Sequence, residues 1–274
     1  MSFFERVVLF LQREAPRPTN YGWFHLTFIA LVVIATVLLC KFATKISDKK
    51  FRIIVASLWG VMLGFEIYKQ VVFSFGGEAG SWNYDWASFP YQLCSTPLYV
   101  LPVVAFVKDG KFRDGAINFI STFAFFGGVC VMVFPNDVFH TNMLGVQIQT
   151  MVHHGLQIIL GIYVAVYNRE KFNLKNLFKF GLAFFLALLV IALVLNVVMF
   201  NLVEDRFNMF YIGPKYECTL PLLSMIYPKV PYVAFFLIYS LGFVLCAVIM
   251  YYLIYGGMVL ASKVLSKKKS KNNA

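Results

Sequence analysis

Hydrophobic residues are grouped along this chain in seven long runs, separated by shorter polar segments. A helix crosses the roughly 30 Å hydrocarbon core of a bilayer with about 20 apolar residues, and each run approaches that length. The predicted helices span residues 23–40, 53–75, 89–107, 114–134, 143–167, 178–200 and 231–260. The pattern predicts an all-α polytopic membrane protein in which residues 1–274 form one seven-helix domain.

Composition agrees with this class. Hydrophobic residues make up 60% of the chain and charged residues 14%, whereas soluble domains are roughly 25% charged. A mean hydropathy of +0.73, with 30 Phe and 15 Tyr, excludes a disordered chain, a collagen and a cysteine-stapled secreted module.

The distribution of Lys and Arg predicts the orientation, because these residues are retained in cytoplasmic loops. The first, third and fifth loops are basic, with Lys41, Lys45, Lys49, Lys50 and Arg52; Lys108, Lys111 and Arg113; and Arg169, Lys171, Lys175 and Lys179. The loops at 76–88 and 135–142 contain neither Lys nor Arg. We therefore expect the N-terminus outside and the basic tail, 263–274, in the cytoplasm. This asymmetry, together with attraction of the tail to anionic lipid, explains the net charge of +11 without a nucleic acid partner.

The sixth loop, residues 201–230, is much longer than the others. It contains aromatic residues, two internal prolines and a short apolar stretch at 220–226 that is too brief to span a membrane. This composition is typical of an interfacial or re-entrant lid on the outer mouth of the bundle. The alternative is a loop that only connects two helices.

Polar residues inside apolar helices are the best candidates for function. The second helix contains Glu66, followed by Lys69 and Gln70, and the third contains Cys94. The fifth helix has four polar residues spaced by three, four and three positions, which places them on one face: Gln147, Thr150, His154 and Gln157. His153 lies about 100° away from His154 and is expected to pair with Gln149 instead.

Three of these residues are predicted to lie at one depth. Counted from the nearest cytoplasmic cation, Glu66 is 66 − 52 = 14 positions inside, Cys94 is 108 − 94 = 14, and His154 is 169 − 154 = 15. At 1.5 Å per residue these counts place the three residues about 21–23 Å above the inner edge, in the outer third of the bilayer. Asn196, in the sixth helix, is 196 − 179 = 17 positions from Lys179 and lies slightly higher.

A thiol and an imidazole at one depth could form a nucleophile and base pair. Pro90 can open the third helix, so that the helix dipole favours a Cys94 thiolate, and Pro97 predicts an irregular turn. Three simpler readings stay open: a packing cysteine, a Glu66–Lys69 ion pair, and a His154 that only bonds a neighbouring helix. No metal site is predicted, because adjacent histidines diverge on a helix and the chain has no HxxxH or HExxH motif.

These residues resemble a known family. Glu66, the FPYQLC segment ending at Cys94, and the HHGLQ segment containing His154 are similar to the YwaF-like integral membrane proteins, which are related to the vertebrate transmembrane protein 164. In the sixth loop, Asn208-Met209-Phe210, Pro214 and the late prolines also match. The chain departs from the pattern at Gln92, where the family often has His, and at the Phe210-Tyr211 pair.

The resemblance implies a phospholipid acyltransferase or transacylase, with Cys94 as nucleophile and His154 as general base. Glu66 or Gln157 would orient the imidazole, and Asn196 or loop amides would hold the oxyanion. The implied partners are phospholipid and lysophospholipid in a bilayer, expected to be a bacterial plasma membrane. No cofactor is expected.

Two other classes compete with this reading. In a membrane transporter or small-molecule binding protein, Glu66, Lys69 and His154 would line a polar pathway. In a structural or assembly protein, replacing Cys94 or His154 by Ala would cost only packing.

Overall fold

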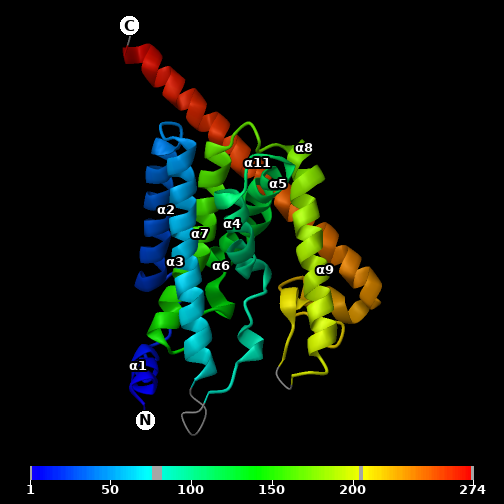
Figure 1. Ribbon diagram of the computed structural model, residues 1–274. Helices are drawn as coiled ribbons and strands as arrows, with labels where there is room; N and C mark the ends of the chain where they lie inside the picture. Colours follow the sequence, from blue (N-terminus) through cyan, green and yellow to red (C-terminus); the bar gives the residue numbers. More distant parts are fainter. Residues whose placement is uncertain (1, 76–81, 204–205, 273–274) are drawn as a thin grey trace.

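The computed structural model describes residues 2–75, 82–203 and 206–272, and these residues are helical with no named strand (Figure 1). Among them, six helices are long and apolar enough to cross a membrane, and Leu93–Phe106 is a shorter seventh. The six are α2 (Trp23–Ala43), α3 (Asp48–Ser74), Lys111–Val133, α7 (Leu144–Tyr167), Leu174–Met199 and the first part of α11 (Tyr232–Asn272). The predicted all-α, multi-pass fold is confirmed. Residues 76–81, 204–205 and 273–274 of the predicted loops and tail lie outside the described residues.

Two of the spans are composite. Lys111–Val133 consists of α5 (Lys111–Phe119), a π-helical turn η3 (Ile120–Ala124) and α6 (Phe125–Val133). Leu174–Met199 consists of α8 (Leu174–Asn176), a second π-helical turn η5 (Leu177–Gly181) and α9 (Leu182–Met199). The helix axis continues through both turns, so each composite still serves as one span.

The third predicted helix, 89–107, begins later than expected. The chain forms a 3₁₀ turn η1 (Trp86–Ser88), continues without helix to Gln92, makes a second 3₁₀ turn η2 (Leu93–Ser95), and enters α4 at Pro97–Phe106. Proline suits the first helical position, where its fixed φ is already helical and its missing N–H would have no partner. Pro97, rather than Pro90, therefore opens this helix.

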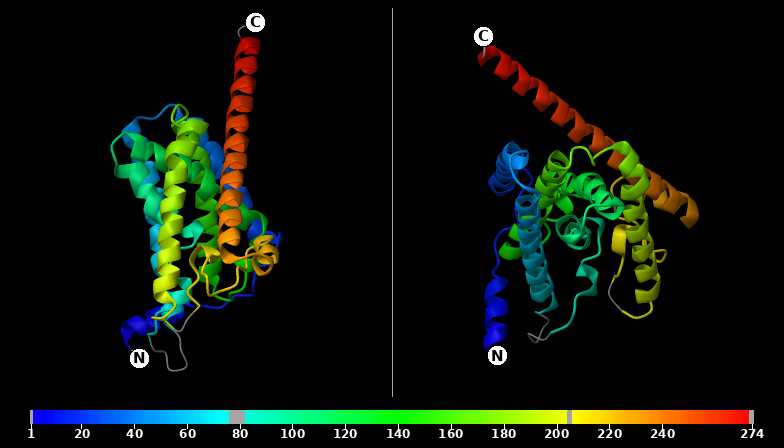
Figure 2. Two further views of the ribbon diagram at one scale, coloured as in Figure 1. Left: turned by 90° about the vertical axis from the view of Figure 1, so that its right-hand side faces the viewer. Right: turned by 45° about the horizontal axis from the view of Figure 1, so that its top comes forward.

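Helix α7 is the central element of the bundle. It packs against α2, α3 and α6, and 72% of its most apolar window is buried, compared with 11% for α2. Helices α2 and α9 are apolar on all sides, as a lipid-facing helix should be. Figure 2 shows α11 running obliquely along the bundle, with its C-terminal part projecting beyond the other helices.

One end of the bundle, here named the basic end, carries the α2–α3, α4–α5 and α7–α8 loops. An ionic network joins these loops around Arg113, which is buried at 1% exposure. Arg113 Nη1 lies 2.5 Å from Asp109 Oδ1, and Lys171 Nζ lies 3.0 Å from Asp109 Oδ2. The hydrogen bond from Lys171, together with the charge of Arg113, lowers the pKa of Asp109 below its ordinary value. Asp48, at the start of α3, completes the network 3.7 Å from Arg113 Nη2.

The opposite end, here named the N-terminal end, holds a helix that the sequence did not predict. Helix α1 (Phe3–Leu11) begins with a capping box between Ser2 and Glu5. The Tyr68 hydroxyl donates to the Leu11 carbonyl over 2.7 Å, and the Gln12 amide donates to the carbonyls of Val72 and Phe75. These bonds dock α1 on the end of α3.

The long loop between α9 and α11 also lies at the N-terminal end (Figure 1). It contains a 3₁₀ turn η6 (Met209–Tyr211), α10 (Leu223–Ile226) and a further 3₁₀ turn η7 (Tyr227–Lys229). The apolar stretch at 220–226 thus holds one short helix in which Met225 is exposed, and Leu222, the residue before the helix, is exposed as well.

Candidate active site around Cys94

Cys94 lies in the irregular turn that precedes α4. The Leu93 carbonyl accepts hydrogen bonds from the backbone N–H and the hydroxyl of Thr96, at 3.2 and 2.6 Å. It cannot bond the backbone at Pro97, which has no N–H. The predicted irregularity at Pro97 is confirmed, and it leaves Cys94 half-buried just before the helix.

The backbone carbonyl of Cys94 docks this turn onto α7. It accepts hydrogen bonds from His153 Nε2 at 2.9 Å and from Gln157 Nε2 at 2.6 Å. His153 and Gln157 are one helical turn apart, so both side chains reach the same carbonyl. The expectation that His153 turns away toward Gln149 was wrong, because His153 contacts the cysteine turn directly.

The hydrogen bonds of the two histidines assign their tautomers. A carbonyl oxygen only accepts, so His153 carries its proton on Nε2 when neutral. His154 carries its proton on Nδ1, which lies 2.8 Å from the Thr150 carbonyl. His153 Nδ1 and His154 Nε2 then each hold a lone pair, and both atoms are buried without a hydrogen-bond partner among the described residues. The two rings lie 5.4 Å apart.

A charged pair from α3 completes the polar cluster. Lys69 Nζ lies 2.8 Å from Glu66 Oε1, and the Gln70 amide donates to the same oxygen over 2.7 Å. The ion-pair reading of Glu66 and Lys69 is confirmed. Both charges also interact electrostatically with Cys94 and with His154. Glu66 Oε2 is buried and has no hydrogen-bond partner in the described part of the chain.

Helix α6 contributes two glycines at its contact with α7 and the cysteine turn, and a side chain would interfere at Gly128. A Cβ added at Gly128 would lie 2.8 Å from Gln157 Cβ and 2.8 Å from the His154 carbonyl oxygen. A Cβ at Gly127 would lie 3.8 Å from Cys94 Cβ. The bare face of α6 therefore lets α7 and the cysteine turn approach closely.

Two predicted site residues clamp the long loop instead of facing the thiol. Asn196 donates to the Met209 carbonyl over 2.8 Å and accepts from the Met209 N–H over 2.6 Å. Asn196 therefore anchors the loop through both its amide nitrogen and its oxygen, and these two bonds use one of its two amide N–H groups. Asn208 accepts from the Gly213 N–H at 2.8 Å, and Pro214 follows in the same turn.

Gln92 makes a matching clamp, and its role was missed in the sequence. Its amide donates to the Asn208 carbonyl over 2.9 Å, and its oxygen accepts from the Phe210 N–H over 2.8 Å. This pairing holds the loop directly over the cysteine turn, two residues from Cys94. An amide in an otherwise apolar segment is the signal that could have indicated it.

The remaining predicted residues of α7 have structural partners. Gln147 donates to the carbonyls of Pro16 and Thr141, at 3.2 and 3.1 Å, and so ties the N-terminal segment to the bundle. The Thr150 hydroxyl lies 3.4 Å from Gln149 Oε1, while the Thr150 carbonyl orients His154. Thr150 thus reaches the site through its backbone.

This fold and site define the class of the protein. It is a multi-pass helical membrane protein in which a cysteine-bearing turn docks on a histidine-bearing helix. The chain belongs to the TMEM164 family, whose family model matches residues 20–264. Comparison with curated proteins and with solved structures gives no match.

Proposed function

We propose that this protein is a membrane-embedded acyltransferase that carries an acyl chain on Cys94 and transfers it between phospholipid and lysophospholipid. The observation that supports this most directly is the docking of the cysteine turn on α7, beside histidines whose lone-pair nitrogens are buried and unpartnered within the described residues. General-base activation of a thiol needs an imidazole nitrogen with a free lone pair, and the helix that holds the Cys94 carbonyl carries two such nitrogens.

In the proposed reaction, His154 Nε2 takes the proton of the Cys94 thiol. The thiolate attacks the ester carbonyl of a phospholipid, the C–O bond breaks, and the departing lysophospholipid oxygen receives the proton from His154. A thioester remains on Cys94. The hydroxyl of an acceptor lysophospholipid then gives its proton to His154 and attacks the thioester, which forms the new ester and restores the thiol.

The residues around this pair have positioning roles. The Thr150 carbonyl holds His154 in the tautomer whose Nε2 can accept a proton. His153 and Gln157 hold the Cys94 carbonyl, which fixes the position of the cysteine backbone against α7. The Gln92 and Asn196 clamps keep the loop closed over the site.

The proposed orientation follows the cations, with the basic end in the cytoplasm. The site then lies near the outer leaflet, where lipid ester carbonyls are found just below the headgroups. The reaction transfers an existing acyl chain, so the mechanism requires no cofactor.

The test is acyl transfer by purified protein in lipid nanodiscs, with isotope-labelled phospholipid as donor and lysophospholipid as acceptor. We expect Cys94→Ala and Cys94→Ser to abolish transfer, and wild type to form a hydroxylamine-sensitive acyl adduct on Cys94. Cys130→Ala is the matched control, because Cys130 is equally half-buried but lies in α6. Full activity of Cys94→Ala would refute the proposal.

A transporter is the second candidate, and the buried Glu66–Lys69 pair is the observation that favours it. The two functions separate in the same variants. Transport through this pair would survive Cys94→Ala and fail in Glu66→Gln, whereas acyl transfer requires the thiol.

A further inference from the structure

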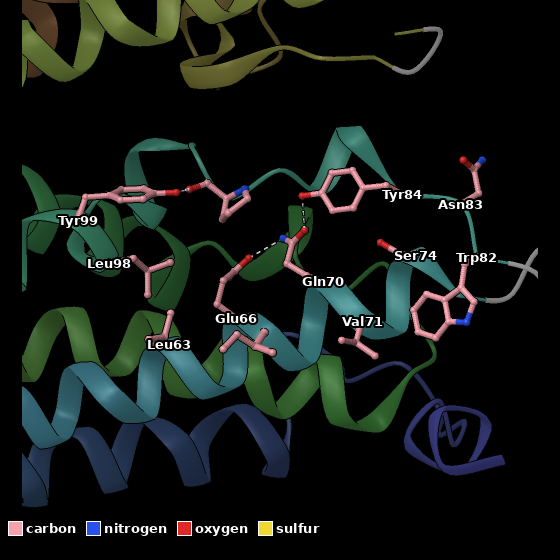
Figure 3. A pocket seen from close by; sticks show the side chains of 12 residues that line it. Leu63, Glu66, Gln70, Val71, Ser74, Trp82, Asn83, Tyr84, Leu98 and Tyr99 are labelled. Atoms are coloured by element: carbon pink, nitrogen blue, oxygen red, sulfur yellow. Dashed lines mark hydrogen bonds between the residues drawn. The ribbon is translucent and has the colours of Figure 1, made fainter. Parts of the chain in front are cut away.

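A cavity of about 530 Å³ lies between residues 82–99 and the second half of α3 (Figure 3). The proposed reaction does not use this cavity. On α3 its wall runs from Leu63 through Glu66 and Gln70 to Ser74, at the three- and four-residue spacing of one helical face. Ser74 lies 74 − 63 = 11 positions after Leu63, which corresponds to about 16 Å along the helix axis. The cavity is therefore an elongated groove.

The two ends of the groove differ in chemistry. Leu63, Ile67 and Leu98 line the inner part, whereas Ser74, Asn83 and Tyr84 lie toward the N-terminal end. Ile67 is 56% exposed and would face lipid in a membrane. The groove therefore opens laterally to the bilayer. It is apolar in its inner part and polar toward the membrane surface, which matches a lipid whose chain lies inward and whose headgroup lies at the surface.

Most polar groups in the groove are already satisfied. The Gln70 amide donates to Glu66 Oε1 and to the Ser88 carbonyl, and its oxygen accepts from the Tyr84 hydroxyl over 2.7 Å. Burial and the charges of Glu66 and Asp85 raise the pKa of Tyr84, so its hydroxyl keeps the proton for this bond. The Tyr99 hydroxyl donates to the Pro90 carbonyl over 2.8 Å. These bonds build the walls and leave no donor among these groups for Glu66 Oε2.

Among the described residues, Glu66 Oε2 has no hydrogen-bond partner, and the Glu66 side chain is 5% exposed. Lys69 already balances the charge of this carboxylate at Oε1. Glu66 therefore needs a hydrogen-bond donor but no second cation, and a hydroxyl meets that requirement better than an ammonium group does.

We propose that this groove binds the acyl acceptor, a single-chain lipid with a free hydroxyl. This inference rests on the proposed acyl transfer. The chain lies along the inner part near Leu63 and Leu98, and the hydroxyl donates to Glu66 Oε2. The same Glu66 interacts electrostatically with Cys94, which lies in the segment between the groove residues Pro90 and Leu98. A hydroxyl held at Glu66 is thus beside the cysteine turn.

The experiment measures binding alone, in the full-length Cys94→Ala variant in phospholipid nanodiscs. The probe is a lysophosphatidylcholine with a photoreactive diazirine in its acyl chain, competed either by the unlabelled lipid or by its analogue without the glycerol hydroxyl. We expect crosslinks in peptides covering 63–74 and 82–99. We expect the deoxy analogue to compete at least about tenfold less well, as is typical of a lost hydrogen bond to a charged group.

Variants identify the groove and the carboxylate. Leu63→Trp fills the inner part and should reduce crosslinking severalfold, whereas Val190→Trp, on the exposed face of α9, should not change it. Glu66→Gln should remove most of the preference for the hydroxyl lipid.

Crosslinks confined to other segments would overturn the groove assignment. Equal competition by the deoxy lipid, or a preference that follows an amine headgroup instead, would overturn the hydroxyl contact. The wild-type protein could show no acyl transfer and still give crosslinking that depends on the hydroxyl group. That result would refute the proposed function but would support this binding site.

Discussion

Gly127 and Gly128 of α6 offer a matched pair of Gly→Ala substitutions that test the geometry of the site. In Gly128→Ala, the new methyl group would lie 2.8 Å from Gln157 Cβ and 2.8 Å from the His154 carbonyl oxygen. In Gly127→Ala, the methyl group would lie 3.4 Å from Gln157 Oε1 and 3.8 Å from Cys94 Cβ, which is ordinary contact. The same atoms are added one residue apart, but only the methyl group at Gly128 would lie closer than 3.0 Å to its neighbours.

The magnitude follows from these distances. Carbon atoms pack best at about 3.5–4.0 Å, so Gly128→Ala must move α6 and α7 apart by about 0.7–1.2 Å at the His154 turn. Overpacking of this kind costs about 1–3 kcal/mol. Both substitutions gain the same helix propensity, about 1 kcal/mol. The difference between the two variants in the free energy of unfolding is therefore about 1–3 kcal/mol.

The assays are loss of helical circular dichroism in mixed detergent and dodecyl sulfate micelles, and acyl transfer in nanodiscs. A displacement near 1 Å at reacting groups lowers the rate about 100-fold, so Gly128→Ala should lose most activity while Gly127→Ala retains it. Equal stability and equal activity of the two variants would refute the described packing of α6 on α7.

Three further results are expected. Asn196→Leu removes both hydrogen bonds to Met209, which costs about 1–3 kcal/mol, and should speed limited proteolysis in loop 206–230 without altering helix content. The pKa of Asp109 is lower in the folded protein than in the unfolded chain, so its ionised form stabilises the fold. This stability is fully present above the unfolded-state pKa and is lost as the pH falls through the folded-state pKa. Asp109→Asn should therefore flatten the acid side of a stability–pH profile below about pH 4. His154→Ala should slow alkylation of Cys94 by a lipid-like electrophile more than His153→Ala does, since His153 positions the turn and His154 accepts the proton; the opposite order would reverse the two roles.

The helices were predictable because each one has a local cause. Apolar runs of the right length predicted the six helices that are long enough to span a membrane, whereas the third predicted helix, 89–107, is shorter than expected. Pro97 predicted the irregular turn before it. Helix α1 was missed because it has only nine residues and is held by bonds from Tyr68 and Gln12 to distant backbone. Contacts of that kind leave no periodic signal in the sequence.

The candidate site was predictable in its residues and less so in its pairings. Gln157 lies three positions from His154 and four from His153, so it shares a face with either histidine. The polar stripe predicted that Gln157 acts together with His154, whereas in the structure Gln157 and His153 together hold the Cys94 carbonyl. The clamp between Gln92 and residues 208–210 crosses more than a hundred positions, and only the three-dimensional arrangement could reveal it.

The unpartnered atoms near Cys94 share one property that connects the site with its proposed substrate. Glu66 Oε2, His153 Nδ1, His154 Nε2 and Gln157 Oε1 are buried without partners among the described residues. Given the tautomers that the two histidines adopt, all four atoms are acceptors. Unmet polar groups are costly in a membrane interior, so this cluster requires several donors at once. The Cys94 thiol and the remaining N–H groups of Lys69 are donors within the cluster, and a hydroxyl-bearing lipid would supply a further one. A site with this many unpartnered acceptors is suited to remove protons, which the proposed acyl transfer requires from a thiol in its first half and from an alcohol in its second.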